Sequence, residues 1–212
     1  MNETRPRIFI VDDDEPFNKS LARLLKSGGF DVETFLSAQE FLEREAYHEP
    51  CCLLLDVRMP GLTGPDLQRE LAERDESLPI VFLTAHGDVP TGVNAMKLGA
   101  LDFLLKPVAE NDLFEAVDRA LNEDAQIKSK KREIREAIDL VESLTSRELE
   151  VFRWIIAGML NKQIAAELGI TERTIKAHRA QIMQKLDVVS VAQLVRIAEK
   201  ADIFPAKDNP YP

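Results

Sequence analysis

Hydrophobic positions in the first 121 residues alternate between two periodicities. Short runs of consecutive apolar residues, typical of strands buried on both faces, occupy 7–11, 52–55, 80–83 and 102–105, with a more polar run at 31–34. Between these runs, apolar residues recur every three or four positions. This predicts helices that begin near Pro16 and at Ser37 and that span 65–74, 92–98 and 112–121. Five strand–helix repeats predict an α/β domain with a doubly wound, five-stranded parallel sheet.

The pattern after residue 121 predicts helices only. Residues 122–143 are highly charged and contain no glycine or proline, so we expect a helical linker that continues the preceding helix. Three apolar residues in it recur every seven positions, which leaves two alternatives open: a solvated single helix or a two-helix coiled contact. Residues 161–168 and 171–186 are predicted helices separated by Gly169-Ile170, the outline of a helix-turn-helix.

Charge divides the chain in the same way as periodicity. The net charge is −10; residues 1–124 carry 12 Lys and Arg against 25 Asp and Glu, whereas residues 125–212 carry 15 against 12. The acidic first part repels polyanions, and the mildly basic second part tolerates them. We therefore expect four parts, which are an α/β domain at 1–121, the linker at 122–143, an all-α four-helix domain at 144–203 and a tail at 204–212.

Two further features limit the class of protein. No apolar run approaches the roughly 18 residues of a membrane span, and the first residues lack the features of a secretory signal. We therefore expect a cytoplasmic protein with no membrane partner. Cys51 and Cys52 are the only cysteines and are adjacent, which suits neither a disulfide framework nor a CxxC metal site. Two buried thiols in a strand are expected.

Polar residues that could take part in catalysis or in ligand binding directly follow the predicted strands. Asp12 and Asp13 follow the first strand, Asp56 the third, Thr84 the fourth and Lys106 the fifth. Because the carboxyl ends of parallel strands meet at one edge of a sheet, these side chains should gather there. Crowded carboxylates favour Mg²⁺, and the lysine and threonine can pair with phosphoryl oxygens. The set predicts a site where an aspartate accepts a phosphoryl group.

These residues lie in motifs that resemble the receiver domain of two-component response regulators, which has a flavodoxin-like fold. The motifs are IFIVDD, LLLDVRMPGLTG, VFLTAHGD and GALDFLLKP, and they cover the first 120 residues. The resemblance implies that Asp56 is the phosphoacceptor. It also implies that Mg²⁺ is held by the acidic pair Asp12 and Asp13 together with Asp56 and the backbone carbonyl of Arg58.

The same resemblance implies a switch. Lys106 would pair with the phosphoryl group, and the hydroxyl of Thr84 would turn toward it. Phe103 would move into the vacated space and reshape the surface of the fourth helix and fifth strand. His86 occupies a position that varies in the family, and we expect it to face solvent.

The second part of the chain resembles the LuxR-type DNA-binding domain, as in FixJ and NarL. The motifs LTSRE, GMLNKQIA and TIKAHRAQIMQKL carry the resemblance over residues 144 to about 200. In helix 171–186, Ile175, Ile182 and Leu186 are expected in the core, and basic residues occupy the remaining surface, which suits a major groove. Ala180 replaces a lysine found in some relatives, so base preference cannot be transferred. The residues expected at DNA are Lys162, Arg173, Thr174, Lys176, Ala177, Arg179 and Lys185.

Together, the two resemblances imply a FixJ/NarL-type response regulator rather than an enzyme. A sensor histidine kinase would phosphorylate Asp56. The chain would then form a homodimer, bind double-stranded promoter DNA and act on RNA polymerase. Two alternatives remain open: a phosphatase or phosphotransferase that uses Asp56 as a covalent intermediate, and an adaptor that does not bind DNA. Turnover of small phosphoesters would favour the enzyme, and single labelling with slow hydrolysis would favour the regulator.

Overall fold

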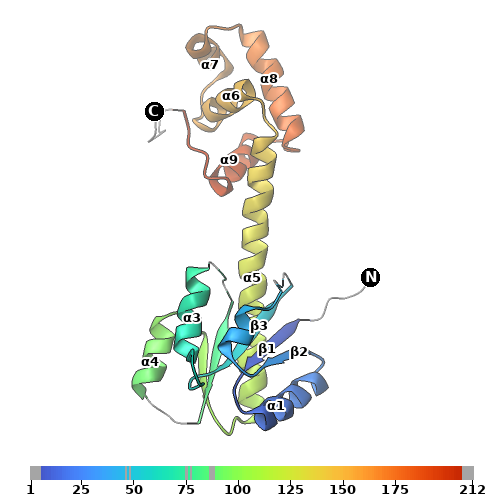
Figure 1. Cartoon of the computed structure of the whole chain (residues 1–212). Helices are drawn as coiled ribbons and strands as arrows, with labels where there is room; N and C mark the ends of the chain where they lie inside the picture. Colours follow the sequence, from blue (N-terminus) through green and yellow to red (C-terminus); the bar gives the residue numbers. More distant parts are fainter. Residues whose placement is uncertain are drawn as a thin grey trace. The chain divides into compact units, whose positions relative to one another are not determined.

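The computed structural model describes residues 6–45, 47, 49–74, 76, 78–85 and 89–206, with the backbone alone at 89–91. The chain divides into two compact units, Met1–Lys128 and Ser129–Pro212. The boundary falls inside a single helix, α5 (Glu110–Glu142), which Figure 1 shows as one unbroken element. No helix in the described part of the chain is both long and apolar enough to cross a membrane.

The first unit is built on the predicted parallel sheet. Its strand order is β2-β1-β3-β4-β5, and every neighbouring pair is parallel. The strands begin and end within two residues of the predicted positions, because their apolar runs are bounded by charged or turn-forming residues. Their bounds are β1 (Arg7–Val11), β2 (Asp31–Phe35), β3 (Cys51–Asp56), β4 (Ile80–Thr84) and β5 (Asp102–Leu105).

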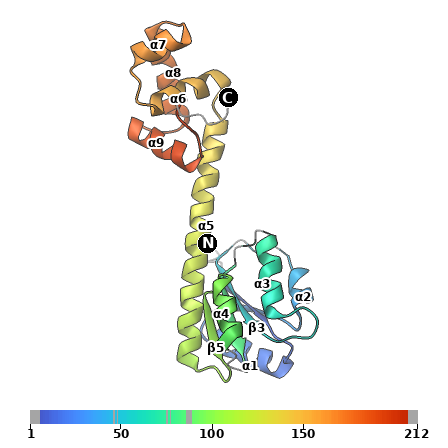
Figure 2. The same cartoon turned by 90° about the vertical axis from the view of Figure 1, so that its left-hand side faces the viewer.

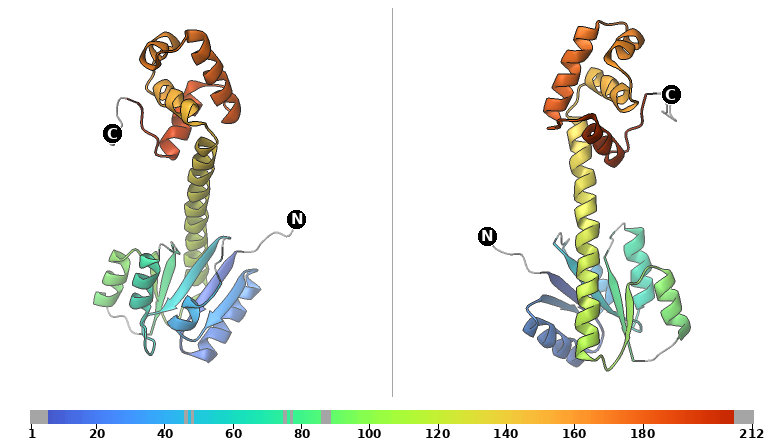
Figure 3. Two further views of the ribbon diagram at one scale, coloured as in Figure 1. Left: turned by 45° about the horizontal axis from the view of Figure 1, so that its top comes forward. Right: turned by 180° about the vertical axis from the view of Figure 1, so that it is seen from behind.

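Helices cover both faces of this sheet, so the doubly wound fold is confirmed. One core layer joins the sheet to α2, α3 and α4, and the other joins it to α1 and α5. Figures 2 and 3 show the two layers from the side and from behind. The bounds are α1 (Glu15–Ser27), α2 (Ala38–Leu42), α3 (Gly64–Glu73) and α4 (Val89–Lys97). Cys51 and Cys52 are buried free thiols in β3, as expected.

The first unit extends beyond residue 121 because of a buried ion pair on α5. Asp124 is fully buried, and its carboxylate accepts a hydrogen bond of 2.7 Å from the backbone N–H of Cys51. The ammonium of Lys128 lies 2.7 Å from the same carboxylate and also donates to the backbone carbonyl of Glu49. These contacts fasten α5 to the start of β3.

The second unit is a four-helix domain together with the last turns of α5. Its helices are α6 (Ser146–Ile156), α7 (Asn161–Leu168), α8 (Glu172–Lys185) and α9 (Val191–Lys200). Ile175, Ile182 and Leu186 are buried in one core, as predicted. Of the heptad positions in the linker, Val141 is buried whereas Ile134 is exposed. The helical conformation predicted for 122–143 is confirmed through Glu142.

Helix starts in the second unit are capped at all positions but one. Thr145 and Ser190 form the two predicted capping boxes, and the Thr171 hydroxyl accepts a bond from the N–H of Thr174. At α7 the N-cap is Leu160, whose side chain makes no capping bond and is 69% exposed. Only the second bond of a capping box is formed, in which the Gln163 side chain accepts a 2.8 Å bond from the Leu160 N–H.

Leu160→Ser is therefore expected to stabilise the second unit by about 1 kcal/mol, because a serine hydroxyl can accept from an N–H of the first turn, as the Ser190 hydroxyl does at α9. The exposed leucine side chain contributes little that would be lost. Urea denaturation followed by far-UV circular dichroism measures the change. Leu160→Ala is the matched control, since it removes the apolar side chain without adding a cap. Equal stability of the serine and alanine variants would contradict the prediction.

Candidate functional site

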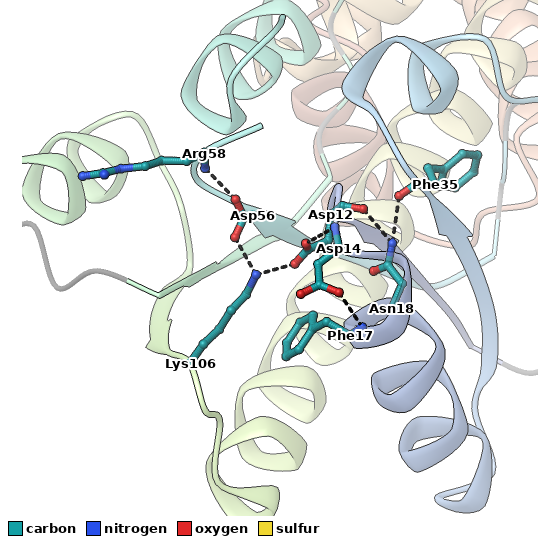
Figure 4. Close-up of polar contacts among 8 residues, drawn as sticks. All are labelled: Asp12, Asp14, Phe17, Asn18, Phe35, Asp56, Arg58 and Lys106. Atoms are coloured by element: carbon teal, nitrogen blue, oxygen red, sulfur yellow. Dashed lines mark hydrogen bonds and ion pairs between the residues drawn. The ribbon is translucent and has the colours of Figure 1, made fainter. Parts of the chain in front are cut away.

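Three strand ends bring Asp12, Asp56 and Lys106 together at one edge of the sheet. Asp12 follows β1, Asp56 is the last residue of β3, and Lys106 follows β5. The Lys106 ammonium lies 2.5 Å from Asp12 Oδ2 and 2.6 Å from Asp56 Oδ1. Figure 4 shows the lysine side chain reaching both carboxylates. The structure thus brings into contact three of the five side chains that were predicted to gather at this edge.

Burial and the pairing of opposite charges shift the pKa values at this site in opposite directions. Asp12 is 1% exposed and Asp56 is 7% exposed. Burial raises the pKa of Asp12, and the hydrogen bond from Lys106 only partly offsets this. Burial alone would lower the pKa of Lys106, but its bonds to Asp12 and Asp56 outweigh that effect and raise it. The lysine therefore remains an ammonium and balances the buried negative charge.

Backbone groups fix the orientation of both carboxylates. Asp12 Oδ1 accepts a 3.0 Å bond from the N–H of Asp14, and Asp56 Oδ2 accepts a 2.6 Å bond from the N–H of Arg58. Gly64 at the start of α3 lies against Asp56, because a Cβ at position 64 would overlap the Asp56 carbonyl oxygen. Only glycine permits this approach of α3 to the end of β3.

The expected switch residues lie on β4, which pairs with the strand of Asp56, and on β5, which pairs with β4. Thr84 is the last residue of β4 and is 3% exposed. Its carbonyl oxygen accepts a 2.7 Å bond from the Lys106 N–H, so its backbone is tied to the end of β5. Phe103 on β5 is half-buried and packs near Phe82 and beside Gly92 of α4. His86 lies outside the described residues.

The expected metal ligands are only partly assembled. Asp12 and Asp56 direct carboxylate oxygens at one cation, the Lys106 ammonium, so this edge accommodates positive charge. Their oxygens are the donor type that Mg²⁺ prefers. Asp13, however, is exposed, and no three His, Cys, Asp or Glu side chains in the described ranges converge on a metal position. The site thus fits a divalent cation through two carboxylates, and the full predicted ligand set is not preformed.

Two residues of α1 reach this site without having been predicted from the sequence. The Asn18 amide donates to the carbonyl oxygens of Asp12, at 2.8 Å, and of Phe35, at 3.1 Å. The Phe17 ring centroid lies 4.3 Å from the Lys106 ammonium nitrogen. Both residues have ordinary helical spacing, so periodicity gives no sign of these contacts. The only sequence signal is their place in the first turn after the acidic run, near Pro16.

A second candidate site is the outer surface of α8. Arg173, Thr174, Lys176 and Ala177 are exposed there, and Lys162 is exposed near the start of α7. Lys176 pairs with Glu172 on the same helix at 3.1 Å. Arg179 is half-buried and donates a 3.1 Å bond to the Asn161 side chain, which ties α8 to α7. Since a guanidinium has five N–H donors, others stay available to a ligand.

Lys185 makes a structural contact that sequence reasoning did not anticipate. Its ammonium lies 2.6 Å from the buried Glu148 carboxylate and 3.4 Å from the Ser143 carbonyl oxygen. Glu148 also accepts a bond from the Thr145 N–H as part of the α6 capping box. Lys185 thus joins the end of α8 to the start of α6, which leaves less of its charge for the expected phosphate contact.

This contact predicts a pH dependence. The Lys185 ammonium, followed by the Thr145 N–H, lowers the pKa of Glu148 from 4.5 to about 2. A lowered folded-state pKa contributes stability that is fully present above pH 4.5 and is lost as the pH falls toward about 2. We expect the melting temperature of the wild type to fall more steeply over that range than that of Glu148→Gln, which cannot titrate. Parallel curves for the two proteins would contradict this.

Comparison with known families matches both units. Residues 8–118 match the family model "Response regulator receiver domain", and residues 142–198 match "Bacterial regulatory proteins, luxR family". The chain is 45% identical over 200 residues to the response regulator protein TmoT of Ectopseudomonas mendocina, covering 94% of this chain and 91% of TmoT. It is 38% identical over 208 residues to the transcriptional regulatory protein FixJ of Azorhizobium caulinodans, covering 98% of each.

Solved structures give the same result. The response regulator StyR superposes with a TM-score of 0.86 at 47% identity, over 93% of this chain and all of that one. Full-length FixJ from B. japonicum superposes with a TM-score of 0.56 at 38% identity, over 93% of this chain and 98% of that one. The chain therefore belongs to the two-component response regulators that join a receiver domain to a LuxR-family DNA-binding domain, and it is a transcriptional regulator.

Proposed function

We propose that Asp56 is the residue phosphorylated in this regulator and that a sensor histidine kinase supplies the phosphoryl group. The observation that carries the proposal is the pairing of Asp56 Oδ1 with the Lys106 ammonium at 2.6 Å, inside a pocket where Asp12 is also buried. A charged amine at this distance can neutralise oxygens that gain charge during phosphoryl transfer. Asp56 is held by the Arg58 N–H and keeps its direction as a nucleophile.

The transfer makes one bond and breaks one. A carboxylate oxygen of Asp56 forms a bond to phosphorus while the bond between phosphorus and the kinase histidine nitrogen breaks, and that nitrogen keeps the electron pair. Mg²⁺, held by Asp12, Asp13, Asp56 and the Arg58 carbonyl, would supply additional charge neutralisation when bound. Lys106 keeps its proton and pairs with a phosphoryl oxygen. Water later hydrolyses the acyl phosphate and restores the carboxylate.

The switch is proposed to pass from Asp56 to α4 and β5. The phosphoryl group carries about 1.5 to 2 negative charges in place of the single carboxylate charge of Asp56, and it brings new acceptor oxygens, which the Thr84 hydroxyl can approach. The Phe103 ring lies beside Gly92 of α4, where a Cβ would meet it, so its inward movement would change this surface. Four apolar side chains are already exposed there and would favour a homodimer. They are Val93, Met96, Leu98 and Leu105, exposed by 49%, 46%, 45% and 57%.

The outer surface of α8 is proposed to read promoter DNA. Lys176, Ala177 and Arg179 would enter the major groove, with Arg173 on the same surface. Lys162, Thr174 and, to a smaller extent, Lys185 would contact phosphates. Two copies on neighbouring half-sites would then present a surface to RNA polymerase, and these partners imply action in the cytoplasm. The alternative of a phosphatase or phosphotransferase is disfavoured by relatives that are transcriptional regulators.

A mobility-shift titration tests this proposal. The DNA is a set of duplexes enriched from a random-sequence pool by the chain after treatment with an acyl phosphate and Mg²⁺. Phosphorylation is expected to tighten binding. Lys176→Ala is expected to weaken it by about 1–3 kcal/mol if the lysine contacts a base edge. Lys200→Ala is the matched control, because this half-exposed lysine lies on α9 and pairs with Glu133. Equal binding by Lys176→Ala and wild type would refute the assigned surface.

A further inference from the structure

The first turn of α1 is built to hold Phe17 at the phosphorylation site. The Asp14 carboxylate accepts a 3.0 Å bond from the Phe17 N–H, which caps the helix. The next residue, Asn18, is buried and bonds the Asp12 carbonyl oxygen. Phe17 itself is half-buried and packs against the core between α1, α5 and the sheet. The backbone at position 17 is therefore fixed relative to the end of β1.

The aromatic face of Phe17 lies over the Lys106 ammonium. The ring centroid is 4.3 Å from Nζ, well within the distance at which a cation is attracted to a ring face. The lysine side chain is only 15% exposed, and such contacts are stronger where water is partly excluded. Figure 4 shows Phe17 beside the lysine while Asp12 and Asp56 bind the same nitrogen. Among the described residues, the Lys106 ammonium is thus in contact with two carboxylates, those of Asp12 and Asp56, and with one ring, that of Phe17.

The two carboxylates are the contacts that change during the reaction. Asp56 gives up carboxylate charge when its oxygen bonds phosphorus, and a divalent cation on Asp12 would compete with the ammonium for the same oxygens. A lysine side chain is long and loses much rotational freedom when held in place. The Phe17 contact is not altered by either event, because the ring is neutral and is held by α1.

We propose that Phe17 is a positioning residue for phosphoryl transfer, which keeps the Lys106 ammonium beside Asp56 as the carboxylate contacts change. This inference rests on the proposed role of Asp56 as phosphoacceptor. The ring limits the directions that the lysine can take, so that the ammonium is already near the position where negative charge develops.

Three variants separate this role from simple packing. Phe17→Leu keeps an apolar side chain against the core but removes the aromatic face. Phe17→Tyr keeps the aromatic face, so it is the conservative variant that should still position the Lys106 ammonium. Urea denaturation of each variant shows whether the fold is kept. The third change, Lys106→Met, removes the cation and shows whether Phe17 acts through it.

The first test is made without metal or phosphoryl donor, by NMR of the full chain. A proton above a ring face is shifted upfield, so the Lys106 ε-methylene protons are expected to be displaced upfield in wild type and Phe17→Tyr. They should return to ordinary lysine positions in Phe17→Leu. Unchanged positions in Phe17→Leu, or ordinary positions in wild type, would overturn the contact itself.

The second test is a double-mutant cycle on the rate of phosphorylation by excess acyl phosphate with Mg²⁺, measured by intact mass. Phe17→Leu is expected to slow labelling about fivefold, and Phe17→Tyr by less than about twofold. In the Lys106→Met background, Phe17→Leu should have no further effect. The same double-mutant cycle is repeated on the affinity for beryllofluoride in the presence of Mg²⁺. Beryllofluoride imitates the phosphoryl group, so this measurement involves no chemical step.

The outcomes distinguish this inference from the proposed function. A wild-type rate for Phe17→Leu, or an equal loss in the Lys106→Met background, would overturn the positioning role while leaving Asp56 as acceptor. Labelling of Asp56→Asn as fast as the wild type would instead refute the proposed function.

Discussion

Replacing Asp56 with asparagine is expected to reduce labelling by acyl phosphate to background. Asparagine has nearly the same shape, and its amide oxygen can accept a bond from Lys106 or from the Arg58 N–H. It has no negative charge and no nucleophilic oxygen, so no acyl phosphate can form. The wild type should gain one phosphoryl group per chain in the presence of Mg²⁺. Intact-mass measurement over time compares the two proteins.

The control for this experiment is the same chemical change elsewhere on the receiver domain. Asp118→Asn alters an exposed carboxylate on α5 and should be labelled at the wild-type rate. Asp56→Asn should also keep its fold, because Lys106 retains its bond to Asp12. Labelling of the folded Asp56→Asn variant at one site would show that another residue is the acceptor. Rapid repeated turnover of small phosphoesters by the wild type would favour an enzyme.

Lys128→Met is expected to destabilise the receiver domain by about 3 kcal/mol, because it leaves the Asp124 carboxylate buried without its counter-charge. Asp124 has no exposed surface, and one of its oxygens already lacks a hydrogen-bond partner. The Cys51 N–H would still donate to this carboxylate but carries no full charge. Urea denaturation followed by circular dichroism, with the thiols kept reduced, gives the free energy of unfolding.

A double variant tests the physical reason for this loss. In Lys128→Met/Asp124→Asn the buried group is neutral, and the asparagine oxygen can still accept from the Cys51 N–H. This protein should recover much of the stability lost in Lys128→Met alone. If the double variant is as unstable as the single one, the loss comes from the packing of the lysine side chain rather than from unpaired charge. The single change of the other partner, Asp124→Asn, should lower the free energy of unfolding by less than Lys128→Met does, because Lys128 is 28% exposed and can reach water.

The buried pair also shows why the extent of the receiver domain was not visible in the sequence. Residues 122–128 are mostly polar, with three charged residues among the seven, and such a segment after a helix is typical of a solvated linker. Asp124 is nevertheless as buried as any core residue, because its charge is matched by Lys128 and by a backbone N–H at the start of β3. That partner lies 73 positions earlier in the chain, so no local pattern includes it.

The order of strands and helices was determined by the sequence itself. Continuous apolar runs can be buried only in a sheet covered on both faces, and the alternation with helices makes neighbouring strands parallel. Asp12, Asp56 and Lys106 each follow a strand directly, so the geometry of any parallel sheet brings their backbones to one edge. The acidic site with its lysine was therefore predictable from strand ends alone, without a single long-range contact.

Only the tertiary structure decided which side chains touch there. Phe17 over Lys106 and Lys185 on Glu148 join residues from different elements, through side chains whose direction depends on how those elements pack. Helical periodicity shows which face of a helix is apolar, but it does not show which partner that face meets. Backbone periodicity thus determined the fold and the edge that carries the chemistry. Packing between distant segments decided how each charge is held, because burial and pairing are properties of the assembled core.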